Sequence, residues 1–284
     1  MFQTLIASAQ LADLLSQADI LVFDCRHDLV NHQLGAQAYQ AGHIPGAHFI
    51  NLEQQLAADK YRADGSFAGR HPLPTREQFA LTMQAFRLGP ETQVIAYDGQ
   101  GGMYAARLWW MLRWLGHAKV AVLDGGIQAW QAAGFELSQT IPAVPSPTVA
   151  NFQIKPSLVD FVALETLLDN LQHPQLQVVD ARAPDRFRGE NESIDPIAGH
   201  IPGAINRFFK DNLQSDGYFK PAAQLRAEWQ KLIPDVSKSV MQCGSGVTAC
   251  HNLLALEVAE LQGARLYPGS WSEWCSDSSR PVAR

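Results

Sequence analysis

The sequence lacks the features that mark several large classes of protein. Its four cysteines form neither a Cys-x-x-Cys pair nor a spacing typical of zinc ligands, so no metal site is predicted. Charged side chains interrupt the most apolar stretch, which is therefore not a membrane span. The N-terminus has no basic segment followed by a small-residue cleavage site, so we expect no signal peptide.

Basic residues are scarce as well. The 284 residues include 22 lysines and arginines against 28 acidic residues, and the net charge of −6 argues against nucleic acid as the main partner. A reducing, cytoplasmic setting fits best, because it keeps cysteines free. Apolar residues make up 46% of the chain, enough for a sizeable core, and the length suggests one large or two ordinary domains.

The chain repeats itself. The segment AGHIPGA occurs at residues 41–47 and again, letter for letter, at 198–204. The run VFDCR at 22–26 returns as VVDAR at 178–182. Two copies of one unit are therefore fused in a single chain.

The repeat predicts where the domains begin and end. We place an N-terminal domain at 1–135 and a C-terminal domain at 157–284. Residues 136–156 contain four prolines and few helix formers, so they are predicted to be an extended linker.

Short β-rich runs alternate with helical patterns in the first copy. Strands are predicted at 20–24, 94–98 and 120–123, and helices at 11–17, 76–86 and 103–115. This alternation indicates an α/β fold with a parallel sheet covered on both faces. Ligands of such sheets bind beyond the carboxyl ends of the strands.

One cysteine lies at such a strand end. The run SVMQ predicts a buried strand ending at Gln242, and apolar positions recur at helical spacing from Ala249. The connecting loop consists of Cys243, Gly244, Ser245, Gly246, Val247 and Thr248.

The Cys243 loop is expected to bind anions. A helix N-terminus offers unpaired N–H groups and a partial positive charge. Two glycines let successive N–H groups curl into a nest, and Ser245 and Thr248 add hydroxyl donors. The setting favours a thiolate over a thiol at Cys243. A buried structural cysteine is the alternative, but it gives the glycines and hydroxyls no role.

These segments carry a family resemblance. The whole chain resembles the tandem-domain rhodanese superfamily, the thiosulfate and 3-mercaptopyruvate sulfurtransferases, through the Asp-x-Arg strands, the two Gly-His-Ile-Pro-Gly segments and the Cys243 loop. The resemblance implies two rhodanese-like domains, each a central parallel sheet flanked by helices. It also implies that only the C-terminal domain is catalytic. Asp98 stands opposite Cys243 in the repeat, and a carboxylate cannot carry a sulfane sulfur.

The chemistry that the resemblance implies is covalent sulfur transfer. Thiolate Cys243 attacks the outer sulfur of a small anionic donor, and sulfite or pyruvate leaves. The resulting persulfide passes its outer sulfur to cyanide, a small thiol or a reduced dithiol protein, with ping-pong kinetics. No metal or organic cofactor is needed, and neither nucleic acid nor membrane is an expected partner.

Three arginines follow the matching strand of the second copy. By resemblance, Arg186 grips the carboxylate or sulfonate of the donor, because a guanidinium can hold two oxygens at once. Arg182 is interpreted as structural, paired with nearby acids or carbonyls. Arg188 is a candidate for the same site or a solvated surface arginine, and the surface interpretation is favoured.

The identity of the donor stays open between two alternatives. The loop Cys-Gly-Ser-Gly-Val-Thr looks like the mercaptopyruvate type. Those enzymes usually carry a second arginine, in a Pro-Arg pair before Gly-His-Ile-Pro-Gly, whereas this chain has Glu-Ser-Ile-Asp-Pro at 192–196. Thiosulfate is narrowly favoured, with 3-mercaptopyruvate as the alternative.

A histidine and an acid of the N-terminal half complete the candidate site. His71 and Glu53 lie where family members present such residues toward the active site. The hypothesis is that Glu53 orients His71, which hydrogen-bonds Ser245 or protonates the leaving enolate. The alternative makes both ordinary surface or interface groups. His43 and His200, which recur in identical turns, are expected to stabilise those turns.

Two functions from other classes are weighed against this one. Cysteine-loop phosphatases close a Cys-x5-Arg loop on phosphate, but here the sixth residue after Cys243 is Ala249. A persulfide carrier without turnover, which hands its sulfur only to a bound protein, is compatible with the sequence and stays an alternative.

Overall fold

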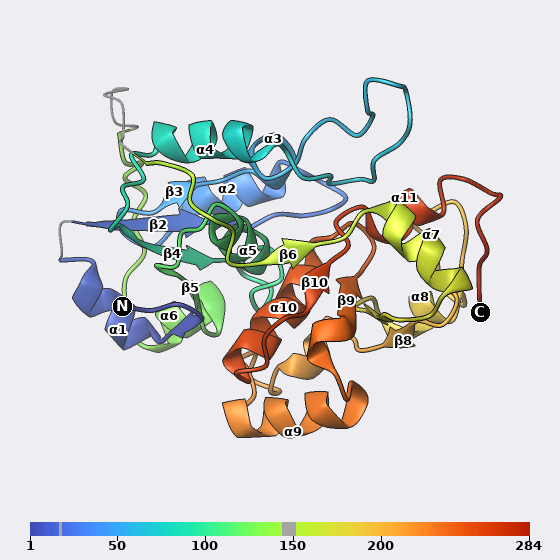
Figure 1. The fold of residues 1–284 in the computed structure, drawn as a ribbon. Coiled ribbons are helices and arrows are strands. Elements are labelled where there is room, and N and C mark those ends of the chain that lie inside the picture. Colours follow the sequence, from blue (N-terminus) through green and yellow to red (C-terminus); the bar gives the residue numbers. More distant parts are fainter. Residues whose placement is uncertain (17–18, 144–151) are drawn as a thin grey trace. The chain divides into compact units, whose positions relative to one another are not determined.

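The computed structural model of the protein describes residues 1–16, 19–143 and 152–284 (Figure 1). The described chain forms two compact units. The first comprises Met1–Ala57, Pro74–Leu158 and Ser215–Phe219, and the second comprises Ala58–Leu73, Val159–Gln214 and Lys220–Arg284.

The units differ from the predicted domain boundaries in two short segments, and the first unit also takes in the described residues of the predicted linker together with residues 157–158. Residues 58–73 belong to the second unit although they precede the predicted linker, and residues 215–219 belong to the first. Residues 144–151 of the predicted linker lie outside the described residues, so its extended form stays a prediction.

A five-stranded parallel sheet forms the centre of the first unit. Its strands are β1 (Leu5–Ile6), β2 (Ile20–Asp24), β3 (His48–Phe49), β4 (Gln93–Tyr97) and β5 (Val120–Leu123). Their order is β1-β5-β4-β2-β3. The three strands predicted from the sequence correspond to β2, β4 and β5.

Six helices surround this sheet in the described part of the first unit. They are α1 (Ser8–Leu14), α2 (Leu34–Ala41), α3 (Leu52–Gln55), α4 (Arg76–Ala85), α5 (Ala105–Trp114) and α6 (Gly126–Ala132). The prediction at 11–17 was wrong at its start, because the Gln10 side chain accepts the Ala7 N–H and caps the helix three residues earlier.

The second unit repeats the same architecture. Its strands are β6 (Asp160–Phe161), β7 (Gln177–Asp180), β8 (Ile205–Asn206), β9 (Ser239–Gln242) and β10 (Arg265–Leu266). They are parallel in the order β6-β10-β9-β7-β8, which matches the first sheet strand for strand. The predicted α/β class, with a parallel sheet in each copy, is therefore confirmed.

The helices of the second unit follow the same plan. They are α7 (Leu164–Gln172), α8 (Pro184–Phe187), α9 (Ala222–Leu232), α10 (Thr248–Val258) and α11 (Ser270–Trp274), with 3-10 turns η1 (Phe209–Asn212) and η2 (Val236–Lys238). Leu167 of α7 and the tryptophans of α11 pack with Val240 on one face of the sheet. Helix α10 contacts β9 and β10, and Ala249–Leu256 are all buried within it.

Burial explains why these segments fold as they do. In the first unit Leu11, Ile127 and Trp130 pack on Ile95 and Tyr97 of β4. Helix α5 is buried along its whole length, because apolar residues occupy every side of it. Its tryptophans are core residues. No helix in the described part of the chain is long and apolar enough to cross a membrane.

Candidate active site

The Cys243 loop connects the carboxyl end of β9 to the start of α10. The Cys243 carbonyl accepts the Trp271 N–H at 3.0 Å, and the Gly244 carbonyl accepts the Ser272 N–H at 3.0 Å. A trans peptide holds its N–H opposite its C=O. The next N–H, that of Ser245, therefore points the other way and meets Cys243 Sγ at 3.5 Å.

Gly246 is required by the turn of this loop. Its φ is +75°, in the left-handed region that side chains disfavour. A Cβ placed on it would lie 2.3 Å from the Pro268 carbonyl oxygen, which is backbone and cannot move aside. The glycine therefore permits both the turn and the close approach of the neighbouring loop.

Ser270 anchors the cysteine from that neighbouring loop. Its Oγ accepts the Cys243 N–H at 3.1 Å and donates to the Tyr267 carbonyl at 2.9 Å. Its φ of +54° is unusual for a residue other than glycine. Ser270 was not singled out from the sequence.

His71 reaches the same loop from segment 58–73 of the second unit. Its Nδ1 lies 2.7 Å from Ser245 Oγ, and both residues are buried. The hydrogen bond expected between these two side chains is thus present. A part for His71 in catalysis stays a prediction.

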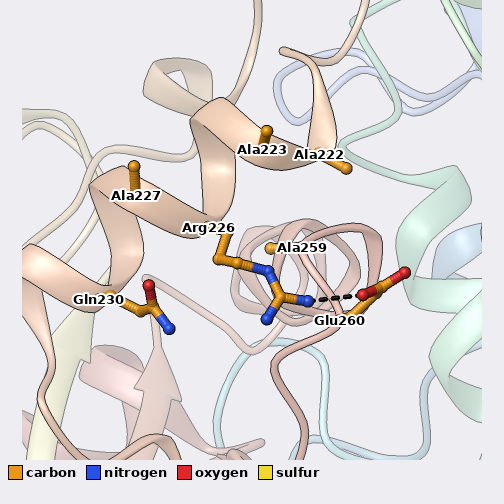
Figure 2. Close-up of a pocket in the computed structure, with 7 residues that line it drawn as sticks. All are labelled: Ala222, Ala223, Arg226, Ala227, Gln230, Ala259 and Glu260. Atoms are coloured by element: carbon orange, nitrogen blue, oxygen red, sulfur yellow. Dashed lines mark hydrogen bonds and ion pairs between the residues drawn. The ribbon is translucent and has the colours of Figure 1, made fainter.

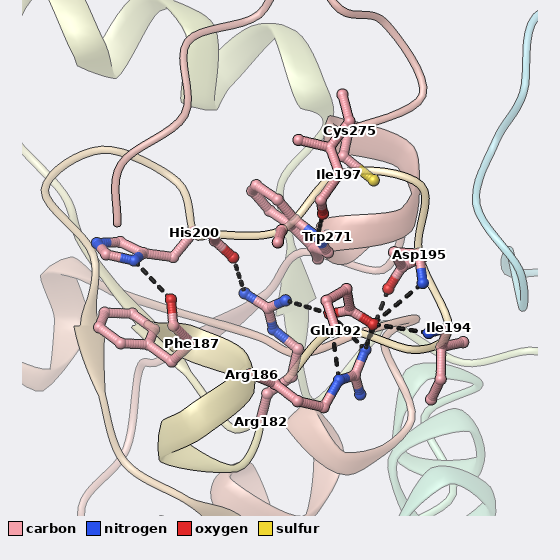
Figure 3. A network of polar contacts seen from close by, with 12 residues as sticks. Arg182, Arg186, Phe187, Glu192, Ile194, Asp195, Ile197, His200, Trp271 and Cys275 are labelled. Atoms are coloured by element: carbon pink, nitrogen blue, oxygen red, sulfur yellow. Dashed lines mark hydrogen bonds and ion pairs between the residues drawn. The ribbon is translucent and has the colours of Figure 1, made fainter. Parts of the chain in front are cut away.

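Arg186 projects from the short helix α8 and is held by two acids (Figure 3). Its Nη2 donates to both carboxylate oxygens of Glu192, at 2.7 and 2.9 Å, and to Asp195 Oδ2 at 3.2 Å. Its guanidinium nitrogens lie 3.8 and 3.9 Å from the position that a Cβ on Gly244 would occupy. The expected donor-binding arginine therefore lies beside the residue that follows Cys243.

The pKa values of the two acids that hold Arg186 are shifted in opposite directions. Burial alone would raise the pKa of Glu192, but hydrogen bonds from Arg186 and from two backbone N–H groups lower the pKa overall. Burial dominates at Asp195, where it raises the pKa above the usual value, and the charge of Glu192 adds to that rise.

Arg182 and Arg188 have partners that favour their structural interpretation. The Arg182 guanidinium donates to the Asp180 carboxylate and to the Gly199 carbonyl, and it lies over the Trp271 ring. Burial opposes its charge, but Asp180 outweighs burial and raises the pKa of Arg182. Arg188 pairs with Glu190, and both side chains are about half exposed.

Arg70 is a site residue that sequence reasoning missed. It precedes His71, and its Nη2 lies 2.7 Å from the position of a Cβ on Gly244. Its side chain forms an ion pair with Asp195. The dipeptide Arg-His before Pro-Leu-Pro was the available signal, but only the histidine was singled out.

The equivalent loop of the first unit holds Asp98 in the place of the cysteine. The Asp98 carboxylate accepts four backbone N–H groups at 2.8–3.0 Å, those of Gln100, Gly102, Tyr104 and Ala105. It thereby caps α5, which explains why this helix begins at Ala105 rather than at the predicted residue 103. The loop is an anion nest filled by its own side chain.

Known proteins match both copies. The model of the rhodanese-like domain matches residues 7–133 and 163–277, which are most of the chain. The chain belongs to the rhodanese family. Its resemblance to the tandem-domain sulfurtransferases is confirmed, and with it the two rhodanese-like domains.

Relatives of this rhodanese-family chain are sulfurtransferases named for two donors. A probable 3-mercaptopyruvate sulfurtransferase of Pseudomonas aeruginosa is 48% identical over 98% of this chain and 97% of its own length. A putative thiosulfate sulfurtransferase, SseB, of Mycobacterium tuberculosis is 38% identical over 99% of this chain and 97% of its own length. The crystal structure of SseA from Escherichia coli, described as a 3-mercaptopyruvate sulfotransferase, superposes with a TM-score of 0.80 at 30% identity. The match covers 95% of this chain and 100% of SseA. The chain is a sulfurtransferase of this class.

The duplicated histidines of the two rhodanese-like units stabilise turns, as predicted. His43 Nδ1 bonds the Tyr39 carbonyl at 2.8 Å, and its ring stacks on the Tyr39 ring. His200 Nδ1 bonds the Phe187 carbonyl at 2.8 Å and stacks on that ring in the same way.

Glu53 lies in the first unit, beside two histidines. Its Oε1 is 3.9 Å from His27 Nε2 and 3.9 Å from His32 Nδ1. Ligand atoms of all three residues lie within 4.8 Å of one another, so this group could hold a metal ion, although the sequence showed no metal spacing. The proposal that Glu53 orients His71 spans both units and stays a prediction.

A shallow pocket of about 320 Å³ lies at the far end of α10 from Cys243 (Figure 2). It is lined by Ala222, Ala223, Arg226, Ala227, Gln230, Ala259 and Glu260. Arg226 pairs with Glu260 at 2.6 Å in this pocket. Neither a nucleophile nor a donor-binding arginine of the site lines it, so it is separate from the chemistry at the Cys243 loop.

Proposed function

We propose that the chain moves a sulfane sulfur from thiosulfate, through a persulfide on Cys243, to cyanide or a thiol acceptor. The observation that carries this proposal is the arrangement at one strand end. A sulfur faces the Ser245 N–H there, and Arg186 lies beside the adjacent Gly244. The acceptor is cyanide, a small thiol or a reduced dithiol protein.

The first half-reaction exchanges one S–S bond for another. The Cys243 thiolate attacks the outer sulfur of thiosulfate, and the electrons of the broken S–S bond leave with sulfite. The Cys243 persulfide keeps one negative charge in the same loop, where backbone N–H groups and the helix N-terminus favour an anion. Arg186 holds the sulfonate oxygens of the donor during the attack.

The second half-reaction frees the cysteine. The acceptor attacks the outer sulfur of the persulfide, and the electrons of that bond return to Cys243 as thiolate. With cyanide the product is thiocyanate, and with a dithiol it is a disulfide and hydrogen sulfide. Because the two products leave in separate steps, ping-pong kinetics are expected. A cytoplasmic, reducing setting is part of the proposal, since Cys243 must stay free.

A second candidate donor is 3-mercaptopyruvate, which the Gly-Ser-Gly-Val-Thr loop and the name of the Pseudomonas relative favour. This donor needs proton transfer, because its leaving group is an enolate, whereas sulfite leaves as a stable anion. His71 and Ser245, which share a hydrogen bond of 2.7 Å, are the groups placed to supply that proton. The Glu192-containing segment, which replaces the second arginine of that enzyme type, favours thiosulfate.

Steady-state kinetics test the proposal. The wild-type protein should release sulfite from thiosulfate plus cyanide over many turnovers, whereas Cys243→Ser should release none. Sulfite released only once per protein molecule would favour the carrier alternative. A kcat/KM for 3-mercaptopyruvate well above that for thiosulfate would reverse the order of the two donors.

The pH–rate profile separates the donors further. His71→Gln should leave the profile with thiosulfate unchanged and should remove a titration from the profile with 3-mercaptopyruvate. Unchanged profiles with both donors would dismiss a role for His71 in proton transfer.

A further inference from the structure

Two histidines and a glutamate of the first unit lie together, away from the Cys243 loop in sequence. Glu53 Oε1 lies 3.9 Å from His27 Nε2 and 3.9 Å from His32 Nδ1. The two imidazole rings have their centroids 5.2 Å apart. One nitrogen from each ring and one oxygen of the carboxylate all lie within 4.8 Å of one another. Three metal-binding side chains therefore surround one small space.

This group lies where a parallel α/β sheet binds its ligands. His27 follows the carboxyl end of β2 by three residues, and Glu53 lies in α3, which follows β3. The segment after the matching strand of the second unit supplies Arg186, which suits an anion. In the first unit that segment supplies two imidazoles instead, and Asp98 already fills the anion nest. The edge of the first sheet is thus suited to a cation.

His27 and Glu53 are held in position by their surroundings. His27 is 3% exposed, and its ring stands edge-on to the Tyr104 ring with the centroids 5.2 Å apart. Its carbonyl accepts the Gln100 side-chain amide at 3.1 Å. The Glu53 N–H donates to Asn51 Oδ1 at 2.9 Å, in the cap that starts α3. These contacts fix two of the three side chains at their base.

His32 is the member that can adjust. Its side chain is 48% exposed, whereas that of Glu53 is 18% exposed. Zn²⁺ holds nitrogen and oxygen ligands at about 2.0–2.1 Å, so neighbouring ligand atoms of a tetrahedral site are about 3.4 Å apart. The two distances of 3.9 Å must therefore shorten by about 0.5 Å, which a turn of the exposed His32 ring and of the Glu53 carboxylate can supply.

We propose that His27, His32 and Glu53 form a binding site for a divalent transition metal ion of the Zn²⁺ class. Imidazole nitrogens and a carboxylate oxygen are ligands that such ions prefer, and two histidines with one glutamate leave a position for water. The ion would join the end of β2, the turn before α2 and the start of α3. This site is independent of the proposed sulfur transfer at Cys243.

Calorimetric titration of Cys243→Ser with zinc chloride tests the site. The serine removes a thiolate that would also bind Zn²⁺. We expect one equivalent to bind in the micromolar range or tighter, since no second group of three such side chains occurs in the described part of the chain. Absence of saturable binding, or binding at millimolar zinc only, would show that the three residues form ion pairs and no metal site.

Single substitutions in the Cys243→Ser background assign the ligands. His32→Gln and Glu53→Gln should each weaken Zn²⁺ binding at least 10-fold, because loss of even an outer partner of a metal ligand costs about 10- to 100-fold. His173→Gln is the matched control, since it removes an exposed histidine at the end of α7, and it should leave the affinity unchanged. Unchanged affinity in either ligand variant, or an equal loss in the control, would overturn the assignment.

Cobalt spectroscopy reports the ligand atoms directly. Co²⁺ bound by two imidazoles and a carboxylate should give visible absorption without the near-ultraviolet band of a cobalt–thiolate bond, and His32→Gln should abolish the signal. A thiolate band would place the ion at one of the remaining cysteines and would contradict the site.

Thermal unfolding gives a readout that does not depend on ligand spectra. Zn²⁺ should raise the unfolding midpoint of Cys243→Ser, because an ion that binds only the folded state stabilises it. His32→Gln in the same background should lose that rise. A rise of equal size in both proteins would place the ion elsewhere and overturn the proposal.

Discussion

The loops at Asp98 and Cys243 begin with the same backbone geometry, which they share through the third residue. Three residues after each, a glycine has nearly the same φ, +73° at Gly101 and +75° at Gly246. The Asp98 carbonyl accepts the Ile127 N–H at 3.0 Å, just as the Cys243 carbonyl accepts the Trp271 N–H. In both loops the second N–H along, from Gln100 or Ser245, points at the side chain.

What differs is the occupant of the loop. The Asp98 carboxylate fills its nest and satisfies four N–H groups, so that loop already holds an anion. Cys243 offers a sulfur atom that can accept a second sulfur. Under the proposed function, the backbone prepares an anion site in both copies, and the side chain decides whether the anion is permanent or delivered by a substrate.

The surroundings of the two loops differ in charge as well. The nearest atoms to a Cβ at Gly244 belong to the guanidinium groups of Arg70 and Arg186. At the equivalent Gly99 they belong to the Gln128 amide and the aliphatic stem of Arg26. Two cations therefore lie beside the second loop, and none of the nearest atoms at the first loop belongs to a guanidinium group.

The largest expected effect is on the free energy of unfolding, from a substitution of Asp98 in the first loop. Asp98→Ala would leave four buried N–H groups without their acceptor and should lower the free energy of unfolding by about 3 kcal/mol or more. Cys243→Ser should change it by about 1 kcal/mol or less, because its side chain accepts one long contact. Urea unfolding measures both. Equal effects would contradict the distinction between a structural anion and a reactive sulfur.

Arg186→Ala tests the cationic side of the comparison. The variant should lose about 2–4 kcal/mol of transition-state stabilisation with either donor, because a charge-assisted clamp on the donor is removed. The measurement is kcat/KM for thiosulfate and for 3-mercaptopyruvate, with Arg226→Ala as control. Wild-type kinetics on both donors would remove Arg186 from the mechanism.

Gly246→Ala tests whether the shared turn demands glycine. The new Cβ would meet the Pro268 carbonyl, so we expect a loss of about 2–3 kcal/mol in the free energy of unfolding. Gly203→Ala is the matched control, since Gly203 has a φ of +77° with nothing within 4 Å of its Cβ position. It should lose only about 1 kcal/mol. Similar losses at both positions would show that the close approach to Pro268 does not matter.

The smallest expected effect is a difference in the order in which the cysteines are alkylated. Burial, with the charges of Asp98 and Asp24, raises the pKa of Cys25, and burial raises the pKa of Cys275 to about 11. A raised pKa keeps a thiol neutral and slow to react below that pH, so neither should be labelled near neutral pH. Peptide mass mapping should find Cys243 labelled well before them. Labelling of Cys25 or Cys275 first would contradict this order.

Local patterns predicted much of the fold and picked out the candidate site. The strands β2, β4 and β5, the Cys243 loop and the Asp98 replacement could be read because each depends on a short segment or on the repeat. Arg186 followed from the family resemblance, which assigns donor binding to its position after the Asp-x-Arg strand. Helix boundaries were less accurate where a side chain capped the helix, as Gln10 and Asp98 do.

The remaining parts of the site depend on contacts between distant segments. Arg70 lies more than a hundred residues before Asp195 and Gly244, and it joins the second unit although it precedes the predicted linker. Ser270 holds the Cys243 N–H from a separate loop. The segment that contains Glu192 and Asp195 was noted only because it lacks the expected arginine. Sequence alone does not reveal which acid pairs with which base.

The most direct measurement is the mass of the protein after incubation with thiosulfate alone. If the loop holds a sulfur anion at position 243 before and after transfer, the Cys243 peptide should gain the mass of one sulfur atom and lose it again on adding cyanide. No gain, or a gain that persists in Cys243→Ser, would contradict the account.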